Sequence, residues 1–293
     1  MGEQIPEKLC GRPLSGADIE VIREEIRRAE PANRAEIARR VCRALDWSNA
    51  RGEPKLMSAR VGLLRLHRAG LIELPAPRCG NGNGGGLKRA PAQWPEAIAL
   101  DGRVDALSGL RLTVVREKAA SRLWNGLIDR YHYLGYRPLP GAQMRYLIES
   151  DQGLLGALGF GAAAWKVAAR DAWIGWDRAR REAHLGRVVN NARFLLLPWI
   201  RVRHLASKVL GLAARRVGED FAERYGERPV LLETFVELAR YRGTCYQAAN
   251  WHYLGETQGR GKCDVAHRAT LPRKGVYVYP LRADFRRALG VAA

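Results

Sequence analysis

The sequence predicts an α+β protein in two parts, an N-terminal winged helix-turn-helix domain and a C-terminal domain built on a mixed sheet. Helical periodicity dominates residues 1–78, whereas strand-like apolar runs alternate with amphipathic helices in residues 96–293. Between the two stands CGNGNGGG, residues 79–86, whose glycines and asparagines favour neither a helix nor a packed strand. We therefore expect a Gly-rich flexible linker over residues 79–95.

Two helices are expected at the start of the first domain. Ile19, Ile22 and Ile26 recur at helical spacing and predict a first amphipathic helix. Asn33, followed three residues later by Glu36, has the pattern of a capping box and predicts the start of a second helix.

A third helix is expected over residues 56–69, with Val61, Leu64 and Leu66 facing the core. The residues that follow, 71–75, are typical of a short strand. Three helices with a tight second turn, closed by a strand, indicate a winged helix-turn-helix domain.

Cationic side chains follow the predicted third helix, among them Lys55, Arg60 and Arg65. Such side chains bind phosphates and guanine edges when a recognition helix lies in a major groove. We therefore predict that these three residues bind DNA. A trihelical interaction module with a solvated charged face is the alternative.

The second domain mixes strands and helices. Strands are expected over residues 110–115, 144–150, 154–160, 194–197, 229–236 and 275–281, and helices over residues 119–131, 205–217 and 244–251. The two strands on either side of Asp151-Gln152-Gly153 are predicted to form a hairpin.

The charge balance indicates a polyanion as partner. The chain of 293 residues holds 49 Lys and Arg against 30 Asp and Glu, a net charge of +19. Residues 170–216 alone hold 11 Lys and Arg against 3 Asp and Glu. Such a concentration is typical of DNA-binding proteins, because each neutralised phosphate releases counterions. The alternative is a solubilising surface, since most of the basic residues are arginines.

A series of long motifs follows in order along the chain. They are RYHYLGY (130–136), RDAWIGW (170–176), NNARFLLLPW (190–199), LASKVL (205–210), PVLLETFV (229–236) and GTCYQAANWHYLGETQGRG (243–261). Together they resemble the DruA family, a component of the Druantia anti-phage system with relatives beside mobile elements. The resemblance implies a DNA-directed role in bacterial defence or element mobility, and it implies no particular reaction.

The order of predicted elements also resembles GNAT-type acyltransferases: a hairpin, a central strand, a long helix and a further strand. In that fold, the loop between central strand and helix carries glycines whose N–H groups hold the pyrophosphate of coenzyme A. Here that loop, residues 198–207, has no glycine. The resemblance therefore implies a divergent GNAT-like scaffold that acts on DNA, with acetyl-CoA in doubt and the cofactor unknown.

Three ionisable residues are candidates for acid–base chemistry. Glu233 stands in an apolar strand, so it is either a catalytic or metal-binding carboxylate or one half of a buried salt bridge to an arginine. Asp171 either acts at a site or pairs with an arginine ahead of a strand over residues 173–176. His132 is either a general base or a partly buried structural histidine. The pattern assigns no metal site.

Cys245 and Tyr246 lie in the densest polar and aromatic motif. Cys245 is a nucleophile if a helix N-terminus lowers its pKa, and otherwise a small core residue. Tyr246 either stacks on a base or packs in the core. A strand-cutting activity would use Tyr131, Tyr133 or Tyr246 as its nucleophile.

Further polar residues of the second domain are predicted to bind nucleic acid. Amides and guanidinium groups grip base edges and phosphates, and a Gly-rich loop lets the backbone approach phosphate. The candidates are Asn190, Asn191, Arg193, Asn250, Arg260 and Lys262.

Several function classes are excluded. The sequence has no P-loop, no H-E-x-x-H or G-x-S-x-G motif and no zinc-deaminase signature. Its five cysteines include no C-x-x-C pair, and it has neither an apolar run long enough for a membrane span nor a secretory signal pattern. We therefore expect a cytoplasmic protein with no membrane association.

These observations lead to a DNA-binding protein that processes or modifies DNA. The alternatives are a non-catalytic adaptor that recruits a partner helicase or nuclease, and a cutting or joining enzyme with a tyrosine nucleophile. Because the chain lacks an ATP-binding motif, any helicase motor must lie in another polypeptide.

Overall fold

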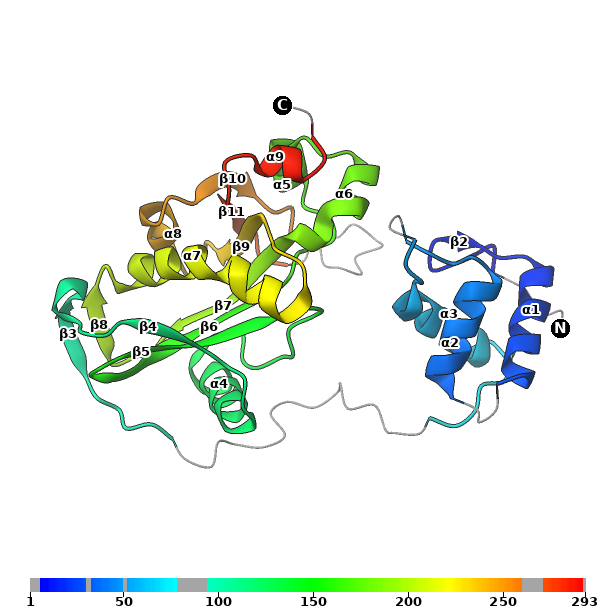
Figure 1. Cartoon of the computed structure of the whole chain (residues 1–293), viewed down its shortest axis with the longest axis horizontal. Helices are drawn as coiled ribbons and strands as arrows, with labels where there is room; N and C mark the ends of the chain where they lie inside the picture. Colours follow the sequence, from blue (N-terminus) through cyan, green and yellow to red (C-terminus); the bar gives the residue numbers. More distant parts are fainter. Residues whose placement is uncertain (1–5, 30–32, 50–51, 78–93, 260–270, 292–293) are drawn as a thin grey trace. The chain divides into compact units, whose positions relative to one another are not determined.

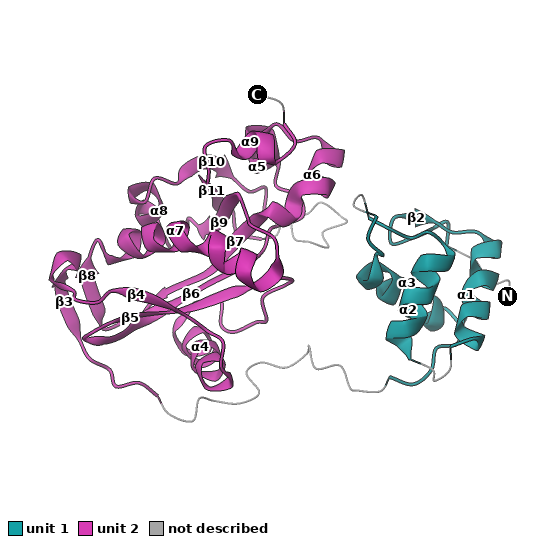
Figure 2. Cartoon of the chain, viewed as in Figure 1, with its two compact units in different colours: residues 1–84 teal, residues 85–293 magenta. Residues whose placement is uncertain are grey.

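The chain divides into two compact units, Met1–Gly84 (unit 1) and Gly85–Ala293 (unit 2), shown in Figure 2. The computed structural model describes residues 6–29, 33–49, 52–77, 94–259 and 271–291. Most of the linker predicted over residues 79–95 lies outside the described residues.

Unit 1 consists of a short hairpin and three helices. They are β1 (Lys8–Leu9), β2 (Arg12–Pro13), α1 (Gly16–Arg27), α2 (Arg34–Ala44) and α3 (Leu56–Arg68). The predicted Asn33 cap is present, because its side chain accepts a hydrogen bond from the Ala35 N–H at 2.9 Å. The helices enclose a separate core around Ile22, Ile37 and Leu66.

The three predicted helices are therefore present, but the second turn of the predicted winged helix-turn-helix is not tight. Residues 45–55 connect α2 to α3, with Trp47 buried and Ser48 bridged to Pro54. The core face of α3 also differs, since Val61 is 44% exposed and Leu63 is buried. A Cβ at Gly62 would meet Leu9 and Trp47, so small residues set the orientation of this helix.

Residues 71–75 do not form the predicted strand. Backbone groups of this segment bond to side chains and not to a neighbouring strand. Arg23 donates to the Leu71 carbonyl at 2.9 Å, and the Leu74 N–H donates to His67 Nδ1 at 3.3 Å. A wing built on this segment is therefore not present among the described residues.

Unit 2 is an α+β domain around a seven-stranded mixed sheet with the order β10-β11-β9-β7-β6-β5-β4. Its strands are β4 (Arg111–Val114), β5 (Met144–Ser150), β6 (Gly153–Ala162), β7 (Val188–Leu196), β9 (Leu231–Glu237), β10 (His252–Glu256) and β11 (Lys274–Pro280). Two further strands, β3 (Leu100–Arg103) and β8 (Ile200–Arg203), pair in parallel outside this sheet. The predicted hairpin is confirmed as β5–β6.

Helices α4 (Lys118–Tyr131) and α7 (Leu205–Tyr225) cover opposite faces of the sheet (Figure 1). The Trp124 indole of α4 donates to the Leu158 carbonyl of β6 at 3.1 Å. The Tyr146 hydroxyl of β5 donates to Asp220 of α7 at 2.7 Å. Shorter helices complete the unit: α5 (Ala168–Ile174), α6 (Arg178–His184), α8 (Thr244–Ala248) and α9 (Phe285–Ala288), with one-turn 3-10 helices η2 (Val104–Ala106) and η3 (Leu185–Arg187).

Of the segment predicted as a strand over residues 173–176, Trp173 and Ile174 instead form the end of α5, and Gly175 caps this helix in a left-handed conformation with a φ of 93°. Strand β7 begins six residues before the predicted start at Phe194. Asn190, Asn191 and Arg193 therefore lie inside the central strand and not before it.

Strands β7 and β9 are parallel neighbours that pair only over Val188–Asn190 and Leu231–Glu233. The remaining strand pairs in the sheet are antiparallel. Beyond Asn190 the side chain of Tyr246 reaches β7, and a bulge interrupts the register between β6 and β7. Where the pairing of β7 with β9 ends, side chains from β7, β9 and α8 therefore meet.

Among the described residues, no helix combines the length and the apolar character needed to cross a bilayer.

The tight packing of β6 gives a test of the sheet. A Cβ at Gly156 would collide with the backbone oxygen of Leu195, which cannot move without breaking the ladder. We expect Gly156→Ala to destabilise the protein by about 1–3 kcal/mol or more in denaturant titrations. Gly211→Ala is the control, since its Cβ would lie 3.9 Å from the nearest atom outside the local helix backbone, in α7. Equal stability of the two variants would contradict this packing.

Candidate functional site

Glu233 of β9 is part of a fully buried ion pair with Arg170 of α5. One Glu233 oxygen, Oε2, accepts from Arg170 Nη1 at 2.7 Å. The other, Oε1, accepts from the Ala164 N–H at 2.7 Å, and Arg170 Nη1 also donates to the Ala164 carbonyl at 2.8 Å. Both side chains are 0% exposed. Of the two interpretations of Glu233, the structure therefore contains the buried salt bridge.

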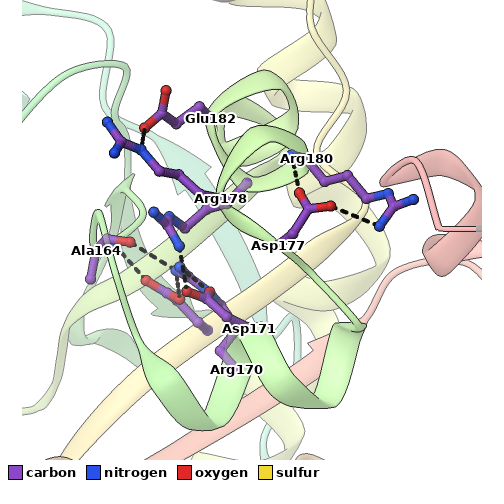
Figure 3. Close-up of polar contacts among 9 residues, drawn as sticks. Ala164, Arg170, Asp171, Asp177, Arg178, Arg180 and Glu182 are labelled. Carbon is purple, nitrogen blue, oxygen red and sulfur yellow. Dashed lines mark hydrogen bonds and ion pairs between the residues drawn. The ribbon is translucent and has the colours of Figure 1, made fainter.

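Asp171 extends this pair into a four-residue ion cluster of Arg170, Asp171, Arg181 and Glu233. Its Oδ1 accepts from Arg170 at 2.7 and 2.9 Å, and its Oδ2 faces Arg181 at 3.3 Å. Figure 3 shows Arg170 and Asp171 facing Ala164, whereas Arg178 pairs with Glu182 nearby. Two arginines thus face two carboxylates, so the buried charges balance.

The ion cluster leaves Glu233 little freedom for chemistry. Complete burial raises the pKa of Glu233, while the charge of Arg170 and the Ala164 hydrogen bond oppose that rise. Both carboxylate oxygens are already engaged and no part of the side chain is exposed. The geometry therefore favours a structural role for Glu233 and Asp171.

Asn191 and Tyr246 meet where β7 and β9 diverge. The Tyr246 hydroxyl donates to Asn191 Oδ1 at 2.7 Å, and the Asn191 amide donates to the carbonyls of Gly159 and Arg193, both at 3.2 Å. Thr234 of β9 donates to the Asn191 carbonyl at 3.0 Å. These bonds satisfy Asn191 and connect the bulged strand to α8.

Tyr246 and Cys245 are core residues of this region. Burial raises the pKa of Tyr246 and also the pKa of the Cys245 thiol. The lowered pKa that a nucleophilic Cys245 requires is therefore absent. Trp251 is buried against Tyr246 with 5.1 Å between ring centroids, whereas Asn250 is exposed and has a φ of 61°.

His132 caps the C-terminus of α4 and is largely buried. Its Nδ1 accepts from the Leu134 N–H at 3.2 Å, and its ring stacks on Tyr133 with 4.9 Å between centroids. Burial, with a contribution from the charge of Arg193, lowers the pKa of His132 from 6.5 to about 4. The imidazole is therefore neutral at pH 7.

Arg193 is the nearest charged group that affects His132. Its Nη1 donates to the carbonyl of the adjacent Ala192 at 2.7 Å, and its Nε has no partner among the described residues. Asn190 likewise has a buried Oδ1 with no described partner. Tyr133, one of the candidate nucleophiles, lies in the same region, and its ring centroid is 5.5 Å from that of Tyr241, which was not among the predicted site residues.

In unit 1, the cationic side chains on α3 and at its N-cap have no acidic partner among the described residues. Lys55, Arg60 and Arg65 are exposed and form no ion pair with a described residue, and the helix itself contains no Asp or Glu. By contrast, Arg27 of α1 pairs with Glu24 at 2.6 Å, Arg28 pairs with the same glutamate, and Arg39 of α2 pairs with Glu36. Arg68 and Met57 also lie exposed on α3, and of these two Met57 was not predicted as a site residue.

Two of the predicted nucleic-acid-binding residues, Arg260 and Lys262, lie outside the described residues. Within the described part of the chain, no group of three His, Cys, Asp or Glu side chains is arranged to hold a metal ion.

The segment between β7 and α7 does not match a coenzyme A loop. Residues 200–203 form β8, which pairs with β3, and His204 occupies the N-cap of α7 with a φ of 64°. No glycine lies here to let the backbone surround a pyrophosphate.

The structure thus brings the predicted residues together in groups. Glu233 and Asp171 share the buried ion cluster, Asn191 and Tyr246 share a hydrogen bond, and His132 neighbours Arg193. The remaining predicted site residues of the described chain do not join these groups through side-chain contacts: Lys55, Arg60, Arg65, Asn190, Cys245 and Asn250.

The ion cluster predicts a large effect of breaking it. Arg170→Met leaves the Glu233 carboxylate buried without its partner, so we expect a loss of about 3–5 kcal/mol in the free energy of unfolding. The double variant Arg170→Met/Glu233→Leu removes both charges and should recover part of that loss. Arg228→Ala, which breaks the surface pair with Glu219, should cost at most about 1 kcal/mol. Denaturant titration measures all three, and similar losses for Arg170→Met and Arg228→Ala would argue against the cluster.

The lowered pKa of His132 predicts a pH-dependent stability. Between pH 6.5 and about 4 the unfolded chain binds a proton at this residue that the folded chain does not, so stability falls as the pH falls through this window. His132→Gln should therefore lose less stability than wild type between pH 7 and 5, by on the order of 1 kcal/mol. Parallel pH profiles for both proteins would show that His132 does not titrate in this way.

Comparisons with known proteins found both solved structures and a sequence relative that this chain resembles. Solved structures that match include the aminoglycoside acetyltransferase AAC(6')-Ib in complex with coenzyme A, with 15% identity, a TM-score of 0.38 and coverage of 61% of this chain and 97% of that chain. An N-acetyltransferase from Staphylococcus aureus Mu50 matches with 13% identity, a TM-score of 0.27 and coverage of 48% and 68%. Similarities at this level carry no argument about activity.

A sequence relative is more informative about the family. The Druantia protein DruA of Escherichia coli (strain UMEA 4076-1) is 30% identical over 125 residues, which are 40% of this chain and 31% of that protein. The matched part thus spans about a third of the length of this relative. Residues 66–270 match the family described as Druantia protein DruA. Since this match extends over more than half of the chain, the protein belongs to the DruA family.

Proposed function

We propose that the protein is a DNA-binding component of a bacterial anti-phage defence system, and that α3 binds duplex DNA. The observation that carries the proposal is the unbalanced charge of this helix. Lys55, Arg60 and Arg65 face solvent without a described acidic partner, whereas Arg27 of α1 and Arg39 of α2 each pair with a glutamate on their own helix. Surface cations that are not neutralised within the protein are available to phosphates.

The spacing on α3 supports this role. Met57, Val61, Arg65 and Arg68 recur three or four residues apart and therefore lie along one face of the helix. Met57 is 69% and Val61 44% exposed, so the face combines cations with apolar side chains. Cations contact phosphates and guanine edges, and apolar groups contact thymine methyl groups, which suits a helix in a major groove.

Family membership supports the biological setting. The family is described as a Druantia protein, and the net charge of +19 suits a polyanionic partner. Whether the chain also processes DNA depends on the second unit, where the predicted catalytic residues have structural contacts. Glu233 and Asp171 are in the ion cluster, Tyr246 is hydrogen-bonded in the core, and burial raises the pKa of Cys245.

These contacts favour an adaptor over a modifying enzyme. Such an adaptor would bind DNA and recruit a helicase or nuclease carried by another polypeptide. Incubation with DNA should then leave nucleoside masses unchanged and form no covalent adduct. A new nucleoside mass would favour a modifying enzyme, and an adduct in a denaturing gel would favour a tyrosine nucleophile.

The role of α3 predicts a specific loss of duplex binding. The triple variant Lys55→Ala/Arg60→Ala/Arg65→Ala should bind a labelled duplex on the order of tenfold more weakly at 150 mM salt, because phosphate contacts are lost. The slope of log K against log salt should fall by about 1 for each contact removed. Fluorescence anisotropy over a series of salt concentrations measures both quantities.

The control is Arg27→Ala/Arg28→Ala/Arg39→Ala, which removes the same charge from arginines that pair with acids on α1 and α2. This variant should retain most of the duplex affinity. An equal loss in the two variants would show that net charge and not the α3 face determines binding.

A further inference from the structure

Arg193 is an unusual arginine in the core of unit 2. Burial lowers its pKa, and the charge of Arg137 lowers it further. The described contacts of its guanidinium include one backbone carbonyl, that of Ala192, and no carboxylate. A half-buried positive charge without a counter-charge is costly, and an anionic ligand would supply what is missing.

Other arginines of unit 2 that are buried or half-buried have a counter-charge or a side-chain acceptor, among them Arg181 and Arg145. Arg181 faces Asp171 in the ion cluster. Arg145 also lacks a described carboxylate, but it donates to Asn125 Oδ1 at 2.9 Å and lies over the Trp124 ring at 5.5 Å. Arg193 has neither a side-chain acceptor nor a described ring contact, and its Nε has no partner.

Aromatic side chains from two other segments surround this position. The rings of His132 and Tyr133, which follow α4, stack with 4.9 Å between centroids, and Tyr133 lies 5.5 Å from Tyr241, which follows β9. The guanidinium of Arg240 lies 5.4 Å from the Tyr133 ring. Arg193 pairs with Gly159 across the β6–β7 ladder, and a Cβ at Gly159 would meet Trp124 of α4, so Arg193 lies on the sheet face that α4 covers. Its charge also acts on the pKa of His132 and of Tyr133, which follow α4 in the chain.

The charge of this region is unbalanced towards cations. Of its carboxylates, Glu237 already pairs with Arg240 at 2.9 Å, and Asp129 at the end of α4 accepts from the Tyr136 N–H at 3.2 Å. Arg193 and the exposed Arg137 therefore remain without a described acid. Tyr241 is 51% exposed, and Leu134, which follows Tyr133 in the chain, is 40% exposed. The region thus combines cations that have no described acid with an accessible aromatic face.

We propose that His132, Tyr133, Arg193, Arg240 and Tyr241 form a binding site for single-stranded DNA, the aromatic–arginine site, with a phosphate on Arg193 and a base stacked on Tyr241. Unpaired strands bind where cations follow the backbone and aromatic rings stack on bases. A single strand suits the site better than a duplex, because its flexible backbone can reach a half-buried guanidinium and its bases are free to stack. The inference goes beyond duplex binding by α3 and rests on the proposal that the protein acts on DNA.

The test compares two DNA probes bound by the full chain. The probes are a fluorescein-labelled dodecamer of thymidine and a labelled duplex hairpin, each measured by anisotropy at fixed salt. Arg193→Met and Tyr241→Ala should each weaken binding of the thymidine dodecamer on the order of tenfold and leave hairpin affinity within about twofold. The triple variant of Lys55, Arg60 and Arg65 should show the reverse pattern.

Two controls separate the roles of charge and stacking. Arg145→Met removes an equally half-buried arginine away from the aromatic–arginine site and should leave dodecamer binding unchanged. An abasic dodecamer keeps the phosphates and loses the bases, so Tyr241→Ala should have no effect on its binding whereas Arg193→Met should weaken it. Circular dichroism checks that each variant is folded. Because Tyr241 is exposed, its variant still tests the site if Arg193→Met does not fold.

Two results would overturn the inference: dodecamer affinity within about twofold of wild type in Tyr241→Ala and in folded Arg193→Met, or an equal loss in Arg145→Met. In both cases duplex binding by α3 would still stand. If the wild-type protein bound neither probe, the proposed function itself would fail together with the inference.

Discussion

The ion pair between Arg170 and Glu233 is the interaction on which the arrangement of unit 2 depends. It connects the α5–α6 insertion to β9, and Glu233 is also the last residue of β9 paired with β7. The parallel contact between these strands is short, so its position needs support from side chains. Arg170 gives that support only when Ala164 and Asp171 are also in place, because they take up its remaining hydrogen bonds.

This arrangement separates charges with a structural role from charges that are free to bind. Inside the ion cluster, two carboxylates meet two arginines, and on α1 and α2 exposed arginines pair with nearby glutamates. Along α3 and at Arg193 no such partner is found among the described residues. Cations that the protein does not neutralise internally are available to anionic partners.

Local patterns predicted most elements of unit 2, and long-range contacts explain the failures. The β5–β6 hairpin and the start of α7 follow from alternation, a turn and helical periodicity within one segment. The segment over residues 173–176 resembles a strand in composition, but its place in α5 depends on packing with distant residues. On α3, the small residues that determine the buried face are not recognised by counting large apolar ones.

The site was predictable in its residue types and less so in their roles. The sequence left Glu233 with two interpretations, because its partner Arg170 lies 63 positions away and many arginines compete for it. Arg193 and His132 were both recognised as candidates, yet nothing local indicates that they are neighbours. Tyr241 was missed because a tyrosine after a strand has no pattern of its own, and it acquires meaning only beside Tyr133.

The distance along the chain between Arg170 and Glu233 also has a consequence for synthesis. On a ribosome, α1 to α3 are complete within the first 68 residues and have a core of their own, so unit 1 can fold while the rest is still being made. Unit 2 cannot complete its fold before β9 has been synthesised, because β9 supplies Glu233 as the partner of Arg170 and is the parallel neighbour of β7. A nascent chain that ends before residue 231 therefore carries an unmatched core arginine and an open sheet edge, and this interval is when the protein most needs protection by a chaperone.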